Sequence, residues 1–264
     1  MHKFQPTTNQ SIPQISVILI TKNEITNLPD CLESIKWAKE IIVVDSGSTD
    51  GTQKLCIDFG CNVIETDWPG FGAQKNRALK EAKESWVFSI DADERVSHSL
   101  LAEMINAVKN SEISGYHIPR RSSYCGRFIK FSGWQPDYVL RLFRKSEGFF
   151  SDDLVHEKVV LSGRTDNLES PLIHYPFNNL EQVINKLNQY SSLGAQQLFA
   201  QGKRATLFKA LFKAIWSFLR SYIFRLGCLD KQEGLMLAIS NAEGTYYKYA
   251  KLALLCRSKD SEKK

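Results

Sequence analysis

The stretch that decides the fold runs from residue 15 to residue 45 and reads ISVILITKNEITNLPDCLESIKWAKEIIVVD. Its two ends, Ile15–Ile20 and Glu40–Val44, are short apolar runs rich in β-branched residues, which is typical of strands buried on both faces. Between them a helical pattern extends from about Asn27 to Trp37. A strand, a helix and a second strand in this order predict a right-handed crossover, which makes the two strands parallel neighbours in one sheet.

The same alternation continues towards residue 90. Two further helical patterns and two further apolar runs follow, in the order Thr52–Phe59, Asn62–Glu65, Gln74–Ala82 and Trp86–Ile90. We therefore predict an α/β protein with a mostly parallel sheet flanked by helices. Past about Ser114 we expect short strands with many aromatic residues. A helical carboxy-terminal extension should follow, with helices at Leu180–Gly202 and Thr206–Leu226.

The composition is that of a folded globular protein. Of the 264 residues, 43% are hydrophobic and 24% are charged, which excludes a disordered chain. Residues from Gln201 onward hold 13 Lys and Arg against 5 Asp and Glu, leaving 21 against 24 in residues 1–200. The six cysteines form no metal-type pair, and there is no signal-peptide segment and no run of about 18 apolar residues. These features favour reduced thiols and a cytoplasmic location.

Asp91 and Asp93 directly follow the strand predicted at Trp86–Ile90. Ligands of parallel α/β sheets bind beyond the carboxyl ends of the strands, and on an extended backbone two carboxylates one residue apart point to the same side. Oxygen ligands of this kind suit Mg²⁺ or Mn²⁺, with substrate phosphates completing the coordination. The alternative is a capped turn, in which Asp93 or Ser97 begins the next helix.

Other strand ends and loops also carry polar side chains. Asp45 ends the second strand and suits a ribose hydroxyl or a base N–H, or else an Asx turn built with Gly47. Glu24 occupies the matching end of the first strand, where a solvated charge is the alternative. Lys75 and Arg77, in the first turns of the third helix, suit a diphosphate or a base carbonyl, or else form a solvated helix face.

Four segments together resemble the successive signature blocks of glycosyltransferase family 2: ISVILITKNE, EIIVVDSGSTDGT, GFGAQKNRAL and VFSIDADE. Within that family the chain is most similar to the lipopolysaccharide inner-core β-1,4-glucosyltransferase subgroup, which acts on heptose. The blocks cover about residues 14–95, and a weaker likeness extends through DDLVHE at residues 152–157 and GCLDKQEGL at residues 227–235. The resemblance implies the Rossmann-like GT-A fold, a nucleotide diphosphate sugar donor, a divalent cation (Mg²⁺ or Mn²⁺) and inversion of the anomeric configuration.

The resemblance also implies roles for individual residues. By position it brings Asp91 to the ribose and makes Asp93 a ligand of the metal. The residues implied around the rest of the nucleotide are Thr21, Glu24 and Asp45 at the nucleoside, and Lys75 or Arg77 near the base or diphosphate.

An inverting transfer needs a carboxylate that takes the proton from the acceptor hydroxyl. This base should come from outside the donor-binding half, and acidic residues cluster after Phe149 and Phe150. We favour Glu157 as the catalytic base, with Asp153 second; the alternative is that these acids are solvated. His156 or His174 could add a nitrogen ligand to the metal. Of the two, we predict His174 as a metal ligand.

The predicted helix Thr206–Leu226 is basic and amphipathic. On a helical wheel Lys209, Lys213, Ser217 and Arg220 share one side, while large apolar residues occupy most of the rest. Such a helix suits the headgroup region of an anionic membrane. Packing of its apolar face on the catalytic domain or on a second subunit is the alternative.

These features predict an inverting, metal-dependent hexosyltransferase at the inner face of the cytoplasmic membrane. We expect it to move glucose from UDP-glucose onto a lipid-linked saccharide, the heptose of the lipopolysaccharide inner core, and we expect no nucleic-acid partner.

Its predicted parts are a polar leader (1–13), a nucleotide-sugar-binding half (14–112), an acceptor-binding and catalytic-base half (113–180) and a basic amphipathic helical region (181–264). One rival is a nucleotidyltransferase, which is disfavoured because TKNE after the first strand is not a Gly-rich loop. The other is a non-catalytic saccharide- or lipid-binding module.

Overall fold

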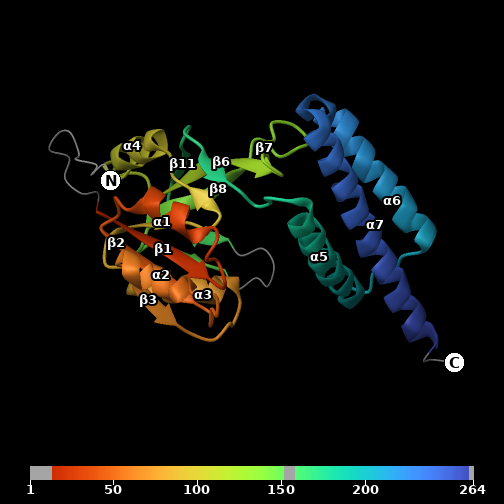
Figure 1. Cartoon of the computed structure of the whole chain (residues 1–264), viewed down its shortest axis with the longest axis horizontal. Coiled ribbons are helices and arrows are strands. Elements are labelled where there is room, and N and C mark those ends of the chain that lie inside the picture. The colour runs from red at the N-terminus through yellow and green to blue at the C-terminus, as the bar shows by residue number, and fades with distance from the viewer. Residues whose placement is uncertain (1–13, 152–157, 262–264) are drawn as a thin grey trace. The chain divides into compact units, whose positions relative to one another are not determined.

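The computed structural model describes residues 14–151 and 158–261, and these form two compact units (Figure 1). The first unit holds the described residues up to Arg120 together with Tyr138–His174. The second holds Arg121–Asp137 and the chain from Tyr175 onward. The boundaries that the sequence suggested for a donor half and an acceptor half stay a prediction.

The first unit is built on the predicted parallel sheet. Its strands β1 (Ile15–Thr21), β2 (Glu40–Asp45), β3 (Asn62–Glu65) and β4 (Trp86–Ser89) lie in the order β3-β2-β1-β4, with β1 parallel to both β2 and β4. The helices that alternate with them are α1 (Leu28–Ile35), α2 (Thr52–Phe59) and α3 (Phe71–Glu81), and α4 (His98–Ala107) follows β4. The α/β class and these elements agree with the prediction. The chain leaves β1 on one side and returns with β4 on the other, so the switch point of the sheet lies between β1 and β4.

Antiparallel strands extend this sheet beyond β4. The strand β8 (Tyr138–Arg144) pairs with β4, and β6 (Gly115–Tyr124) pairs with β8. The strand β11 (Thr165–Asn167) lies parallel to the start of β6, while β9 (Gly148–Phe150) and β10 (Val159–Leu161) form a separate pair. Two very short strands, β5 (Glu94–Arg95) and β12 (Leu172–His174), pair with each other antiparallel and position part of the site.

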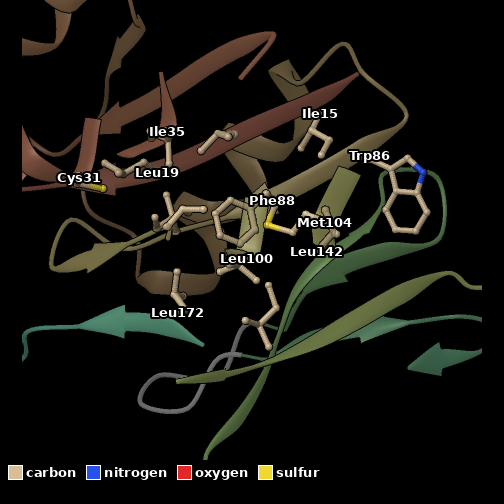
Figure 2. Packing of buried hydrophobic residues seen from close by; sticks show 14 of the residues in the cluster. Ile15, Leu19, Cys31, Ile35, Trp86, Phe88, Leu100, Met104, Leu142 and Leu172 are labelled. Atoms are coloured by element: carbon tan, nitrogen blue, oxygen red, sulfur yellow. The ribbon is translucent and has the colours of Figure 1, made fainter. Parts of the chain in front are cut away.

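Apolar residues cover both faces of the parallel sheet. In β1, Val17 and Leu19 belong to one core cluster and Ile18 belongs to the other, as the period of two in a strand requires. The first cluster takes in the buried faces of α1 and α4, and Figure 2 shows Phe88, Leu100 and other members packed together. The second cluster includes Ala78 and Leu79 of α3. Each large side chain buried here contributes roughly 1.5–3 kcal/mol, so the sheet is a rigid base for the loops at its carboxyl edge.

The second unit is mainly helical. Its long helices are α5 (Leu180–Ala200), α6 (Leu207–Leu219) and α7 (Lys231–Ser261), and α7 contacts both of the others. The helix α6 continues as a π-helical turn, Arg220–Phe224, before a 3-10 turn at Gly227–Asp230. In the part of the chain that the structure describes, no helix is long and apolar enough to cross a membrane.

Two expectations about local structure are corrected. The strand expected at Cys125–Phe131 is only β7 (Arg127–Phe128), because Cys125 and Gly126 have positive φ angles of 49° and 90° and make the tight turn of a hairpin with the end of β6. The single helix expected at Thr206–Leu226 ends its α-helical part at Leu219. The helix α7 was not predicted as a separate element, because a helix that contacts neighbours on two sides has no single apolar stripe.

Candidate active site

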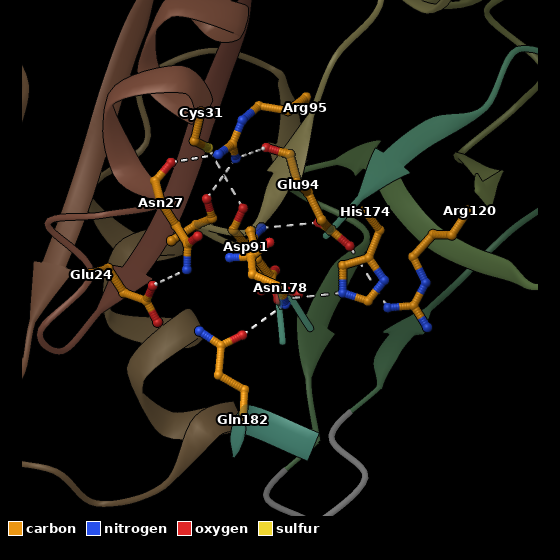
Figure 3. A network of polar contacts seen from close by, with 12 residues as sticks. Glu24, Asn27, Cys31, Asp91, Glu94, Arg95, Arg120, His174, Asn178 and Gln182 are labelled. Atoms are coloured by element: carbon orange, nitrogen blue, oxygen red, sulfur yellow. Dashed lines mark hydrogen bonds and ion pairs between the residues drawn. The ribbon is translucent and has the colours of Figure 1, made fainter. Parts of the chain in front are cut away.

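The loop after β4 is a closed turn, not the extended backbone expected from the sequence. The backbone N–H of Glu94 donates to the carbonyl of Asp91 over 3.0 Å, and the N–H of Asp91 donates back to Glu94 Oε2 over 3.0 Å. Arg95 holds the turn against the start of α1 by donating to the carbonyls of Ala92 (2.7 Å) and Asn27 (2.6 Å). Figure 3 shows this network. Because the backbone turns here, the carboxylates of Asp91 and Asp93 have different partners.

The Asp91 carboxylate lies between two cations. Lys75 Nζ is 3.2 Å from one of its oxygens, and the Arg141 guanidinium donates to the other. Lys75 reaches it from α3 with a side chain that is only 6% exposed. Burial by itself would raise the pKa of Asp91, but Arg141 and Lys75 outweigh it and hold that pKa well below the usual range. Asp91 is therefore an anion whose charge is already neutralised within the protein.

Glu94 lies behind Asp91 and is fully buried. Arg141 donates to its Oε1 over 2.8 Å, and Arg120 from β6 lies 3.7 Å from the same oxygen. Burial raises the pKa of Glu94, the nearby Asp91 charge adds to this, and Arg141 opposes it. One arginine on β8 thus bridges two acids of the turn, and this bridge fixes the orientation of Asp91.

Asp93 has a different neighbour. The antiparallel pair β5–β12 places His174 directly opposite Glu94, and His174 Nε2 then lies 3.4 Å from Asp93 Oδ2. Both side chains are partly exposed, at 26% for Asp93 and 14% for His174. The sequence proposed these two residues as metal ligands, and the structure brings them together.

Asp45 is fully buried, enclosed by its own loop together with Thr21 of β1 and Gln53 of α2. Its carboxylate accepts hydrogen bonds from the backbone N–H groups of Gly47 (3.1 Å) and Ser48 (2.8 Å), from Thr21 Oγ1 (2.9 Å) and from Gln53 Nε2 (2.6 Å). Burial alone would raise the pKa of Asp45, but these bonds, led by those from Ser48, lower it. This is the Asx-turn arrangement that the sequence left open, and Asp45 with Thr21 shapes the loop between β2 and α2.

Glu24 faces the acidic turn from the end of β1. It accepts a hydrogen bond from Asn27 Nδ2 over 3.0 Å. Burial raises its pKa, and the neighbouring charges of Asp93, Asp50 and Asp91 add to this rise against the effect of Asn27. The edge of the sheet at the switch point therefore has a negative face formed by Glu24 and Asp93, which is suited to a cation.

The two cationic residues predicted on α3 have separate roles. Lys75 faces Asp91, and its ammonium lies 5.8 Å from the centre of the Phe150 ring. Arg77 instead pairs with Asp67 (2.7 Å) in the loop after β3 and donates to Gln74 (2.8 Å) on its own helix. Only Lys75 belongs to the network around Asp91.

The sequence reasoning missed Arg141 and Glu94. The signal for Arg141 was its place inside the apolar strand run VLRLF, where a charge must find a buried partner. Asp153 and Glu157, the predicted catalytic bases, lie outside the described residues. Within residues 14–151 and 158–261 no cluster of three or more His, Cys, Asp or Glu side chains suited to a metal is present.

The donor set nevertheless fits a divalent cation held partly by its substrate. Mg²⁺ in enzymes of phosphorylated substrates is commonly bound through one or two carboxylates, with phosphates and water supplying the remaining ligands. Asp93 and His174 place a carboxylate oxygen and an imidazole nitrogen 3.4 Å apart. A ligand set of oxygen and nitrogen atoms also suits Mn²⁺.

Sheet order, switch point and acidic turn define an α/β protein whose candidate ligand site lies at the carboxyl ends of its parallel strands. Comparison with known families then shows a match between residues 16–161 and the model "Glycosyl transferase family 2". The chain belongs to glycosyltransferase family 2 and is a glycosyltransferase. The GT-A class expected from the sequence, with its helical carboxy-terminal segment, is confirmed.

Two curated relatives cover most of the chain. The lipopolysaccharide core biosynthesis glycosyltransferase LpsC of Rhizobium meliloti is 34% identical, over 89% of this chain and 93% of its own length. An uncharacterised glycosyltransferase of Rickettsia typhi is 31% identical, over 90% of this chain and 86% of its own.

Solved structures show more distant likenesses. Residues 1–349 of S. aureus TarS match 93% of this chain and 91% of that one, with 15% identity and a TM-score of 0.48. Glucosyl-3-phosphoglycerate synthase from Mycobacterium tuberculosis, solved with Mn²⁺, uridine diphosphate and glucosyl-3-phosphoglycerate, is 28% identical over 42% of this chain and 44% of that one, with a TM-score of 0.35.

Proposed function

We propose that this glycosyltransferase uses a divalent cation and inverts the anomeric configuration as it moves glucose from UDP-glucose onto a lipid-linked saccharide. The proposed acceptor is heptose of the lipopolysaccharide inner core. The observation that carries the proposal is the pairing of Asp93 with His174 over 3.4 Å, beside an Asp91 already neutralised by Lys75 and Arg141. The name of the relative LpsC, with 34% identity over 89% of this chain, supports the acceptor class.

The donor nucleotide is proposed to lie along the carboxyl ends of β1, β2 and β4. Asp91 would accept from a ribose hydroxyl, since Lys75 and Arg141 keep it ionised and fixed. Glu24 would contact the nucleoside directly. Thr21 and Asp45 would act through the loop that they hold, because their side chains already bond to each other over 2.9 Å. Arg77 would lie at the edge of the donor site, near the nucleotide base.

Asp93 and His174 are the residues that would hold the cation. The chemistry that it would supply is neutralisation of the negative charge that develops on the leaving diphosphate. The protein's own contribution is orientation: the β5–β12 pair and the bonds from Arg95 hold the turn in place before substrate arrives.

A carboxylate must take the proton of the attacking acceptor hydroxyl as that oxygen bonds to the anomeric carbon. We propose Glu157 for this step, and Asp153 as the second choice. Both follow β9, which is joined to α3 by reciprocal hydrogen bonds between Asn76 and the backbone of Phe150 (2.8 and 2.9 Å). Since Lys75 lies on the same helix, β9 and Lys75 share one support.

We further propose that the enzyme works at the inner face of the cytoplasmic membrane, where a lipid-linked acceptor would be presented. The test of the proposed function is a transfer assay with UDP-glucose, UDP-galactose and UDP-N-acetylglucosamine against a heptose-terminated core lipid, with and without Mn²⁺. Glucose transfer that needs Mn²⁺ supports the proposal. Mn²⁺-dependent donor binding without transfer or donor hydrolysis would instead indicate a non-catalytic module, and transfer of a nucleotidyl group would indicate the other rival.

A further inference from the structure

Small residues of α6 and its π-helical turn face α7. Ala210, Ala214 and Ser221 are the buried residues of this segment, and the partly buried Ser217 recurs with them at helical spacing. Ser217 Oγ donates to the carbonyl of Asn241 over 3.2 Å, and Asn241 Nδ2 donates to Ser221 Oγ over 3.2 Å. The wheel drawn from the sequence placed Ser217 on the lysine side, and the structure corrects this. The small-residue contact sets the rotation of α6 about its axis.

With the small side packed on α7, the large apolar side chains of α6 point away from it. Phe208 is 81% exposed and Phe212 is 63% exposed, and the Trp216 and Phe224 rings lie 5.6 Å apart among them. We call the following residues the α6 outer face: Leu207, Phe208, Leu211, Phe212, Ile215, Trp216, Ile223 and Phe224. Contiguous exposed apolar surface of this kind marks a binding surface more often than a solvent-facing one.

The charged residues of the segment that carries the α6 outer face all have one sign. Six basic residues lie between Gln201 and Leu229, and that stretch holds no Asp or Glu. They are Lys203, Arg204, Lys209, Lys213, Arg220 and Arg225. Basic side chains that flank a band of Phe, Leu and Trp match a surface that is negative at its headgroups and apolar beneath them.

We propose that the α6 outer face docks on an anionic lipid bilayer, with Phe208 and Phe212 inserted at the level of the acyl chains and Lys209 and Lys213 among the headgroups. The inference rests on the proposed function in one respect, since it supplies the surface that would bring the enzyme to a lipid-linked acceptor. A second copy of the chain fits less well, because a symmetric contact would press identical positive charges together. A bilayer offers acyl chains to the apolar side chains and negative headgroups to the lysines.

The test is co-sedimentation of the full chain with vesicles at physiological ionic strength. One set of vesicles is pure phosphatidylcholine and the other contains phosphatidylglycerol as its anionic lipid. Phe208→Ser combined with Phe212→Ser removes apolar surface, and Lys209→Gln combined with Lys213→Gln removes charge. The matched controls are Ile57→Ser with Ile184→Ser, which are 61% and 57% exposed on α2 and α5, and Lys54→Gln with Lys109→Gln, which are exposed lysines of the first unit.

The wild-type chain should bind anionic vesicles and bind neutral ones far more weakly. The lysine pair should lower the affinity for anionic vesicles by about 30-fold, and the phenylalanine pair by roughly tenfold or more, while both control pairs bind as the wild type does. Circular dichroism of each variant checks that the helices are retained.

Three results would overturn the inference. The first is a wild-type chain that stays in the supernatant with anionic vesicles, and the second is a phenylalanine pair that sediments as the wild type does. The third is a wild-type dimer, seen by analytical ultracentrifugation, that the phenylalanine pair dissociates with no loss of vesicle binding; the α6 outer face would then be a contact between copies. Failure of the proposed function would appear separately, as absence of Mn²⁺-dependent UDP binding by a chain that still sediments with vesicles.

Discussion

The Arg141 guanidinium, on β8, donates to the fully buried carboxylate of Glu94 over 2.8 Å and also contacts Asp91. This arrangement joins an antiparallel strand to the turn that follows β4 and fixes the direction of Asp91. We infer that Arg141 acts as a positioning residue. It supports the turn on which Asp93 is presented.

Replacement of Arg141 by methionine should destabilise the protein strongly. Breaking a buried ion pair leaves an uncompensated charge and costs about 3–5 kcal/mol, and here Glu94 is the group left behind. Urea unfolding followed by circular dichroism measures the loss. The double variant Arg141→Met with Glu94→Gln should recover part of it, because the stranded charge is gone; a single variant within about 1 kcal/mol of the wild type would show that the bridge is unimportant.

His174→Ala should weaken cation-dependent donor binding without unfolding the chain. His174 is one of two proposed metal ligands. Loss of a residue that only supports a metal ligand costs about 10–100-fold in metal affinity, so loss of His174 should raise the Mn²⁺ concentration needed for half-maximal UDP binding by roughly tenfold or more. Calorimetric titration of UDP at a series of Mn²⁺ concentrations measures this. His98→Ala, on the exposed start of α4, is the matched control and should behave as the wild type does. Equal Mn²⁺ requirements in both variants would remove His174 from the metal site.

Glu157→Gln should lose turnover and keep donor affinity. Removal of a general base costs about 10²–10⁴-fold in rate, whereas the residues that face the nucleotide are unchanged. Steady-state transfer rates compared with UDP affinity separate the two effects. Asp153→Asn is the parallel variant: if it alone loses turnover, the base is Asp153, and if neither does, the base lies elsewhere in the chain.

Asp45→Asn should lower stability in a manner that depends on pH. An amide cannot accept from Ser48, Gln53 and Thr21 together, so the loss at neutral pH should be about 1–3 kcal/mol. The folded pKa of Asp45 is depressed, so its stabilising effect is present above the unfolded pKa, near 4, and is lost as the pH falls through the folded value. Thermal unfolding at pH 7 and at pH 3 should therefore show the gap between variant and wild type shrinking in acid. A gap that stays constant would contradict the assigned hydrogen bonds.

The parallel sheet was predictable because its information is local. Each strand from β1 to β4 is a short apolar run, each helix between them has its own periodic pattern, and the polar residues that follow the strands must meet at one edge. Glu24, Asp45, Asp91 and Asp93 could be selected as candidates on that basis alone.

The contacts among these residues were less predictable because they depend on pairing across the chain. Arg141 meets Asp91 across a separation of 50 residues, through the antiparallel register of β8 on β4. His174 meets Asp93 only because two very short strands, β5 and β12, pair with each other. The direction of the α6 outer face likewise follows from small residues packed on α7, whereas a wheel of α6 alone placed Ser217 on the wrong side.

The most direct test of the central claim is calorimetric titration of UDP into the wild-type chain and into Asp93→Ala, each with and without Mn²⁺. The account predicts that Mn²⁺ strengthens UDP binding to the wild type by at least an order of magnitude, and that Asp93→Ala folds normally but gains nothing from the cation. Equal Mn²⁺ enhancement in both proteins would contradict the assignment of Asp93 as the ligand that joins the protein to the donor diphosphate.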